Sequence, residues 1–177
     1  MPQSHSRQGF TLMELLTVIA IIAVLAALLF PAIRRAILKG EITQARGDMK
    51  NIEQAIKAYV NEYGVLPACT TPNTTDTTYD TPDNSGIIKP LMVSTGSSAT
   101  QNSHGTAFLQ APSRKNAISS SYVFFDPWGT AYKIIVDCNY DNTVSVPGIG
   151  TKYTTVVISS YGPDGTSGTN DTIYSYE

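Results

Sequence analysis

Apolar residues run almost without interruption from Phe10 to Ile33, and Glu14 is the only ionisable side chain in that run. A helix needs about 20 apolar residues to cross a bilayer, so the run predicts a membrane-spanning helix. A carboxylate inside such a span is costly and is therefore a candidate functional group. If the chain were cut after Gly9, the new amine of Phe10 would lie in the same apolar layer. That amine, from the same chain or from a neighbouring chain, would neutralise Glu14.

The apolar pattern continues beyond residue 33 with a helical period. Seven residues recur at steps of three and four and form one stripe: Ile42, Ala45, Met49, Ile52, Ile56, Tyr59 and Tyr63. We expect one helix from Phe10 to about Tyr63, ended by Gly64. Pro31 is expected to kink or locally melt it, because proline lacks an N–H and crowds the preceding turn. A coiled coil fits less well, since the pattern changes from membrane type to globular type after Arg34.

Residues 68–121 are rich in Thr, Ser, Asn, Gly and Pro, with apolar anchors at 87–93 and 107–109. This composition predicts a long exposed loop with one or two short helical turns. Strands are predicted at 131–136, 143–146 and 153–159, where β-branched and aromatic residues gather. A hairpin turn at 139–142 is expected to join the first two. The fold class is therefore α+β, with a long N-terminal helix packed on a small antiparallel sheet.

Composition narrows the function. Residues 64–177 carry five basic and nine acidic side chains, so no basic patch for nucleic acid is expected. The sequence contains no recognisable motif of a histidine pair, a Cys–His couple, a Ser/His/Asp set or a phosphate-binding Gly loop with Lys. The chain is therefore not predicted to be an enzyme. Its two cysteines, Cys69 and Cys138, are compatible with an oxidising compartment. The sequence leaves open whether they form a disulfide.

The leader ending in Gly9, followed by Phe-Thr-Leu-Met-Glu-Leu-Leu at 10–16, resembles the class III signal of type IV pilins and type II secretion pseudopilins. The resemblance implies that a prepilin peptidase cuts after Gly9 and methylates the amine of Phe10. It also implies that Glu14 guides assembly by pairing with the amine of Phe10 on an adjacent subunit. The alternative is a plain membrane anchor or a secretory signal, but a secretory signal would be cut at small residues after the apolar core. Ala26-Ala27 is a poor site of that kind, because Pro31 and two arginines follow.

A second segment resembles the major pseudopilins of type II secretion in particular. Asp126-Pro127-Trp128-Gly129 has the residue order of a type I turn, in which Trp128 is expected to anchor the sheet on the helix. With Tyr132 it resembles the Asp-Pro-Trp-Gly-x-x-Tyr signature of that family.

The Gly-rich segment 160–173 offers many oxygen donors, which suit the roughly six to eight ligands that Ca²⁺ takes. It resembles the calcium loop of major pseudopilins. The resemblance implies Asp164 and the Tyr161 carbonyl as ligands, with Asp171 as the second acid and the Thr169 carbonyl as a weaker choice. A surface turn without metal is the alternative. Residues 137–142 begin like an EF-hand loop but lack its later Gly and Glu, so a hairpin turn is favoured there.

The resemblance divides the chain into a leader at 1–9, a transmembrane and filament-core helix at 10–33, and an amphipathic half of that helix at 34–63. A Thr/Ser-rich variable region follows at 64–121, and a sheet with a C-terminal calcium loop at 122–177. The implied partners are further copies of the chain, minor pseudopilins, the inner-membrane assembly platform with its ATPase, prepilin peptidase and inner-membrane lipid before assembly.

These features imply a structural subunit of a periplasmic pseudopilus, which polymerises from the bacterial inner membrane and drives type II secretion. A type IV pilin or competence pseudopilin, forming a surface or DNA-uptake fibre, is the alternative. A membrane-anchored calcium-binding or carbohydrate-binding domain that never polymerises is more distant. The C-terminal domain would lie in the periplasm, although Arg34, Arg35 and Lys39 after the span favour the opposite orientation by the positive-inside rule.

Overall fold

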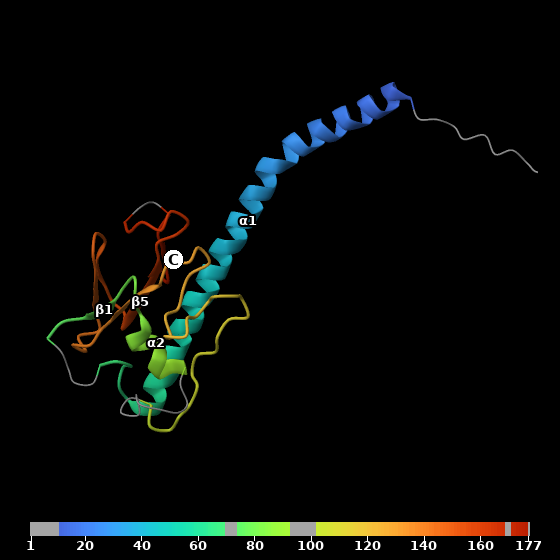
Figure 1. Cartoon of the computed structure of the whole chain (residues 1–177). Coiled ribbons are helices and arrows are strands. Elements are labelled where there is room, and N and C mark those ends of the chain that lie inside the picture. The colour runs from blue at the N-terminus through green and yellow to red at the C-terminus, as the bar shows by residue number, and fades with distance from the viewer. Residues whose placement is uncertain (1–10, 70–73, 93–101, 169–170, 177) are drawn as a thin grey trace, which may run out of the picture. The chain divides into compact units, whose positions relative to one another are not determined.

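The computed structural model describes residues 11–69, 74–92, 102–168 and 171–176 (Figure 1). Two compact units divide the chain, residues 1–40 and residues 41–177, and helix α1 (Leu12–Tyr63) contributes to both. In the first unit the large apolar side chains of α1 are exposed, and α1 is long and apolar enough to cross a membrane.

Helix α1 runs without interruption through Pro31, so the local melting expected there does not occur. Proline removes only one N–H donor, and the apolar turns on either side keep their own hydrogen bonds. The helix ends as the sequence predicts. Gly64 has φ of +71°, and its N–H donates to the Val60 carbonyl at 2.8 Å, which is a left-handed glycine cap.

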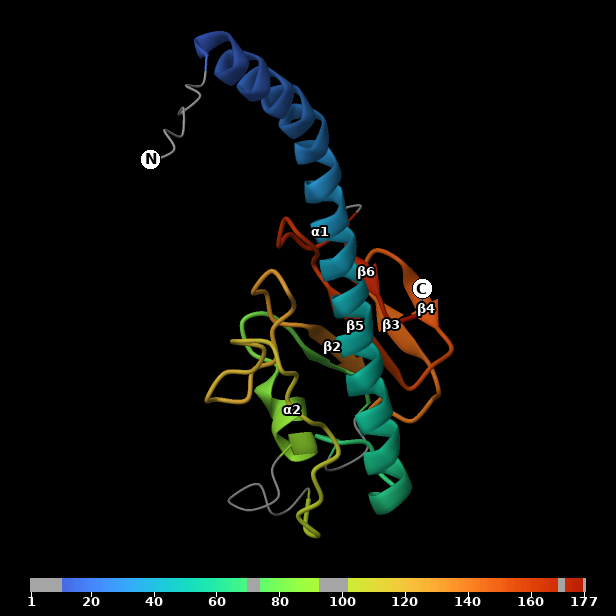
Figure 2. The same cartoon turned by 90° about the vertical axis from the view of Figure 1, so that its right-hand side faces the viewer.

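The predicted stripe is the buried face of α1 in the second unit. Ala45, Met49, Ile52, Ile56 and Tyr59 are at most 2% exposed. They pack in one core with side chains of α2 (Ser85–Met92), β2 (Lys133–Val136) and β5 (Val156–Ser160). Figure 2 shows this half of α1 lying across the strands, with α2 to one side. The α+β fold is therefore confirmed.

Among the described residues, one antiparallel sheet has the strand order β1 (Thr77–Tyr79), β2, β5 and β6 (Ile173–Tyr174). Ile135 of β2 lies opposite Val157 of β5, and Ser160 of β5 lies opposite Ile173 of β6. A separate antiparallel pair joins β3 (Val144–Val146) to β4 (Gly150–Lys152). The three predicted strands are present as β2, β3 and β5.

The predicted hairpin between β2 and β3 is wrong, because β2 pairs with β1 and β5 while β3 pairs with β4. Residues 137–142 instead close on themselves. The buried Asp137 carboxylate accepts the N–H groups of Asp141 at 3.2 Å and Asn142 at 2.8 Å. This side chain satisfies backbone donors that a hairpin would have paired across strands, so the chain leaves the sheet here.

The Thr-rich region is only partly the exposed loop that its composition predicts. It contains one short helix as expected, α2, but also strand β1, and Ile87, Ile88 and Leu91 are fully buried. A buried asparagine fixes its position: the Asn84 amide donates to the carbonyls of Phe124 and Tyr132, each at 2.9 Å. The region therefore supplies part of the core through the apolar anchors, and is less exposed than its overall polar composition predicts.

A disulfide joins Cys69 to Cys138, with Cα atoms 5.5 Å apart and both residues buried. It ties the segment after α1 to the residue that follows Asp137, just beyond the end of β2. The bond encloses residues 69–138, and with them all but the first few residues of the Thr-rich region, within one covalent loop.

Candidate functional site

Glu14 lies in the first turn of α1 and forms a capping box with Thr11. The Thr11 hydroxyl accepts the Glu14 N–H at 3.2 Å, while Glu14 Oε2 accepts the Thr11 N–H at 2.9 Å and the Thr11 hydroxyl at 2.7 Å. Thr-x-x-Glu is the sequence signal for this motif, and sequence reasoning missed it. Glu14 therefore caps its own helix in the described chain. Gly9 and Phe10, the expected cleavage and methylation residues, lie outside the described residues.

The segment at 126–129 is a β-turn, as predicted, closed by the Gly129 N–H donating to the Asp126 carbonyl at 3.2 Å. One oxygen of the Asp126 carboxylate, Oδ1, accepts the N–H groups of Trp128 at 3.1 Å and Thr130 at 2.8 Å. The Trp128 indole donates to Glu41 of α1 at 2.9 Å and packs against the core. Trp128 thus anchors this turn on the helix, as the sequence predicted.

The other oxygen of Asp126 connects the turn to the Gly-rich segment. The Ser160 hydroxyl donates to Asp126 Oδ2 at 2.6 Å and accepts the Gly162 N–H at 3.1 Å. Asp126 is 3% exposed and Ser160 is fully buried. The two segments that resemble the pseudopilin signatures, with Asp126 and Ser160 lying 34 residues apart in sequence, are therefore joined by one buried hydrogen-bond chain.

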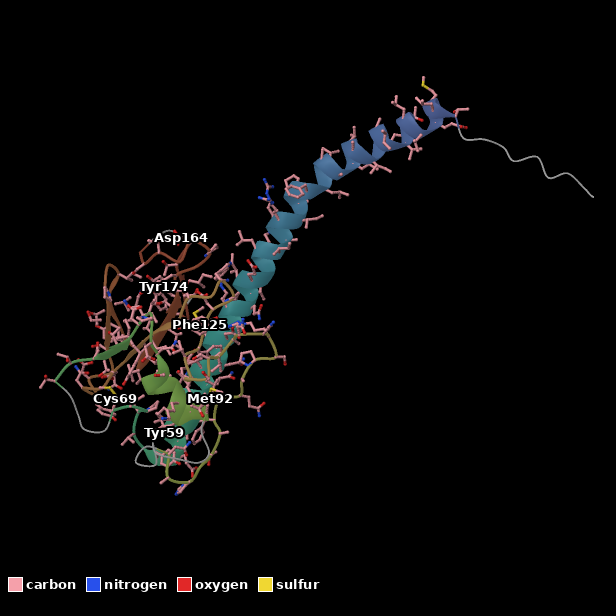
Figure 3. All side chains as sticks on the ribbon, in the orientation of Figure 1. Tyr59, Cys69, Met92, Phe125, Asp164 and Tyr174 are labelled. Carbon is pink, nitrogen blue, oxygen red and sulfur yellow. A yellow bond between two sulfur atoms is a disulfide. The ribbon has the colours of Figure 1, made fainter. Side chains whose placement is uncertain are left out.

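The Gly-rich segment turns sharply after β5. Gly162 has φ of +79° and lies so close to the next passage of the chain that a Cβ would sit 2.3 Å from the Asp171 carbonyl oxygen. The Gly165 N–H donates to the Gly162 carbonyl at 3.2 Å, and the Thr166 N–H donates to Asp164 Oδ1 at 2.8 Å. Figure 3 shows Asp164 on this loop, at the end of the domain remote from Cys69.

The oxygen donors of this loop are of the kind that Ca²⁺ prefers. The close approach at Gly162 brings Asp171 beside the turn that carries Asp164, and carboxylate and carbonyl oxygens are the ligands Ca²⁺ prefers. Within the described parts of the chain no three His, Cys, Asp or Glu side chains gather as a metal cluster. An ion here would therefore depend on two carboxylates and on backbone carbonyls. The Thr169 carbonyl lies outside the described residues.

A charged cluster beneath the loop was missed by sequence reasoning. The Tyr161 hydroxyl donates to Asp80, and the Lys133 ammonium lies 2.9 Å from the same carboxylate. Burial alone would raise the pKa of Asp80, but hydrogen bonds from Tyr161, Lys133 and the Thr81 N–H together lower it. Burial and the neighbouring carboxylate raise the pKa of Tyr161 to about 12. The Tyr161 side chain thus holds the loop to the segment after β1, while its carbonyl is the predicted ligand.

A buried ion pair connects α1 with the Thr-rich region. Arg114 Nη1 lies 2.7 Å from Asp48 Oδ2, the Tyr132 hydroxyl donates to the same oxygen at 3.0 Å, and Arg114 also donates to the Phe125 carbonyl. Burial raises the pKa of Asp48 in spite of the attraction to Arg114. In the sequence Asp48 stands beside Met49 of the apolar stripe, which was the available signal for a buried acid.

Comparisons with known proteins match part of this chain. The family model described as the prokaryotic N-terminal methylation motif matches residues 4–30. The chain is 37% identical over 57 residues to the type II secretion system core protein G of Pseudomonas aeruginosa, covering 32% of this chain and 40% of that protein. It is also 37% identical over 62 residues to the fimbrial protein EcpC of Eikenella corrodens, covering 35% of this chain and 40% of that protein. No solved structure matches the chain.

The matches span about two fifths of the length of each curated relative. The methylation motif, the apolar helix and the small antiparallel sheet packed on that helix support the type IV pilin-like superfamily as the class of this protein. Within that class the chain is similar to the secretion-system core protein, and its helix α1 is long and apolar enough to cross a membrane.

Proposed function

We propose that this chain is a structural subunit of a periplasmic pseudopilus, which polymerises from the inner membrane and drives type II protein secretion. The two curated relatives are equally identical to it, and one is named for secretion while the other is named a fimbrial protein. Sequence identity to these relatives therefore does not distinguish a pseudopilus subunit from a pilus subunit. The distinction has to come from features of the C-terminal domain.

The observation that favours the pseudopilus is how the C-terminus is held. In the family that the leader resembles, type IV pilins usually close the C-terminus with a disulfide loop. Here the two cysteines are already bonded to each other, and Cys138 precedes β5 and β6. The last segment is held instead by the Asp126–Ser160 hydrogen bond and by the close approach of Gly162 to Asp171.

In this proposal prepilin peptidase cuts after Gly9 and methylates Phe10, and Glu14 then directs assembly. The capping box occupies Oε2 of Glu14. Its other oxygen has no hydrogen bond within the described chain and is available to the amine of Phe10 on an adjacent subunit. An acid left unpaired in an apolar layer is penalised, so correct stagger between subunits is favoured. The further partners are minor pseudopilins, the assembly platform and its ATPase.

The C-terminal domain lies in the periplasm in this proposal. Disulfides form and persist in oxidising compartments, and the Cys69–Cys138 bond is buried within the domain core. This chemistry opposes the weak orientation signal of the basic residues after the span. The subunit waits in the inner membrane as a single-pass anchor before it is extracted into the filament.

Calcium is the proposed cofactor of the C-terminal loop. Asp164 and Asp171 would hold it with the carbonyls of Tyr161 and Thr169. The ion would screen two carboxylates that otherwise repel each other. The ordered loop would then present one conformation to neighbouring subunits.

The test of function is a deletion of the gene in its native bacterium, complemented with wild type, Glu14→Ala or Glu62→Ala. Glu62 is a matched control, since it lies on the same helix in the second unit with a 45% exposed side chain. We expect exoproteins to remain cell-associated in the deletion and with Glu14→Ala, and to be secreted with Glu62→Ala. If the deletion strain still secretes exoproteins but no longer yields fibres of this protein when its cell surface is sheared, the protein is a type IV pilin instead.

A further inference from the structure

We propose that Asp126 is a positioning residue for the calcium loop: acting through the Ser160 hydroxyl, it fixes the Gly162 turn against Asp171 and so sets the affinity of the loop for calcium. This inference rests on the calcium assignment in the proposed function. It gives the Asp-Pro-Trp-Gly turn a role beyond anchoring the sheet on α1.

The first step is that the Asp126 carboxylate is itself immobile. Oδ1 accepts two N–H groups from its own turn, those of Trp128 and Thr130, and Trp128 is held to α1 by Glu41. Asp126 as a whole is 3% exposed, so water does not compete for these hydrogen bonds. Its second oxygen, Oδ2, is therefore presented at a fixed place beside β5.

The second step is the direction of the hydrogen bonds at Ser160. An ionised carboxylate only accepts, so the Ser160 hydroxyl donates its proton to Asp126 Oδ2 at 2.6 Å. The lone pairs of that hydroxyl are then free to accept the Gly162 N–H at 3.1 Å. The charge on Asp126 thus determines the direction of both hydrogen bonds at Ser160. The second of these bonds holds the backbone of the loop at Gly162.

The third step is that the position of Gly162 matters for the ligands. There is no room between Gly162 and the Asp171 carbonyl for even a methyl group, and the Asp171 carboxyl carbon would lie 3.3 Å from it. A small displacement of the Gly162 backbone therefore moves Asp171 and the turn that carries Asp164 relative to each other. Partners that orient metal ligands in this way typically contribute 10- to 100-fold to metal affinity.

Two substitutions disrupt the hydrogen bonds between Asp126, Ser160 and Gly162 in different ways. Ser160→Ala removes both hydrogen bonds and leaves the Gly162 N–H and Asp126 Oδ2 without them. Asp126→Asn keeps the shape, but if its amide nitrogen faces Ser160 it donates, so the Ser160 proton loses its acceptor in a fully buried position. Ser159→Ala is the matched control, because Ser159 is a buried neighbour on β5 whose hydroxyl makes no hydrogen bond within the described residues.

The experiment measures calcium dissociation constants by isothermal titration calorimetry on the full chain in detergent micelles, well below the melting temperature of each variant. Trp128 fluorescence verifies that each variant is folded. We expect Ser160→Ala and Asp126→Asn each to weaken calcium binding roughly tenfold or more, and Ser159→Ala to change it less than about twofold. Because both act through one contact, the double variant should bind no more weakly than the weaker single variant.

The results separate this inference from the calcium assignment. Wild-type affinity in Ser160→Ala, equal weakening by Ser159→Ala, or additive effects in the double variant would overturn the positioning role while leaving the calcium site intact. If the wild-type chain itself shows no heat of calcium binding, the calcium assignment fails and the positioning role falls with it.

Discussion

Removing the guanidinium of Arg114 should destabilise the C-terminal domain strongly, because it leaves a buried charge without its partner. The side chains of Asp48 and Arg114 are 6% and 16% exposed. Breaking a buried ion pair from one side typically costs about 3–5 kcal/mol. In an Arg114→Met variant the Tyr132 hydroxyl still donates to Asp48. We therefore expect a loss of unfolding free energy at the lower end of this range, about 3 kcal/mol. That is a large part of the roughly 5–15 kcal/mol by which domains are stable.

The assay is urea denaturation of the full chain in detergent micelles, followed by the fluorescence of Trp128, the one tryptophan of the chain. Lys57→Met is the control, since Lys57 forms an exposed pair with Glu53 along α1 and should cost less than about 0.5 kcal/mol. A double variant, Asp48→Asn with Arg114→Met, should lose less stability than Arg114→Met alone, because no charge remains buried.

The loss should also depend on pH in a defined direction. The folded-state pKa of Asp48 is already raised, and loss of Arg114 removes an attraction that lowers it. A raised folded pKa contributes stability below the unfolded pKa that is lost as pH rises through the folded pKa. The difference between Arg114→Met and wild type should therefore shrink as pH falls from 7 toward 4. A loss below about 1 kcal/mol at pH 7, or one that does not change with pH, would refute the reasoning.

Three further predictions follow from the same structure. Gly162→Ala should destabilise the protein by more than about 1 kcal/mol in urea denaturation, because its φ is +79° and the new Cβ would meet the Asp171 carbonyl at 2.3 Å. In calorimetry the same variant should lose the calcium binding proposed above. A variant as stable as wild type would contradict the close approach. Replacing Cys69 and Cys138 by Ala should lower the unfolding free energy by about 4 kcal/mol, as expected for a loop closed across 69 residues. Wild type measured in a thiol reductant should be no more stable than this variant, because its disulfide is then also absent. Because the pKa of Asp80 is lowered in the folded protein, its ionised form contributes stability that is lost as pH falls through the folded pKa. Asp80→Asn should therefore make the free energy of unfolding depend less on pH in the acid range. An unchanged acid dependence would argue against the hydrogen bonds and ion pair that Asp80 forms with Tyr161 and Lys133.

Local patterns predicted the elements whose cause is local. The apolar stripe on α1 predicted the helix and its buried face, Gly64 predicted its end, and β-branched runs predicted β2, β3 and β5. The turn at Asp126 followed from residue order alone. Each of these depends on residues within a few positions of one another, so the sequence carries the whole signal.

Other features had no local signal. Strand β1 is three residues long and polar, and only its pairing with β2, more than fifty residues away, makes it a strand. The predicted hairpin failed for a related reason, because strand partners are chosen by the whole sheet and the Asp137 carboxylate accepts two N–H groups of the turn. Arg114 and Asp80 look like ordinary surface charges until the fold buries their partners.

The sequence by itself determined the prepilin-type N-terminus, the membrane-spanning character of residues 10–33 and the α+β class, since hydropathy and short motifs are read along the chain. Only the tertiary structure decided that Cys69 bonds to Cys138 and that Asp126 reaches Gly162 through Ser160. Those links join segments 34 to 69 residues apart, so no single segment contains both partners. The disulfide stabilises the fold by closing a long loop, and the hydrogen bonds at Ser160 depend on the exclusion of water, which only the folded domain provides.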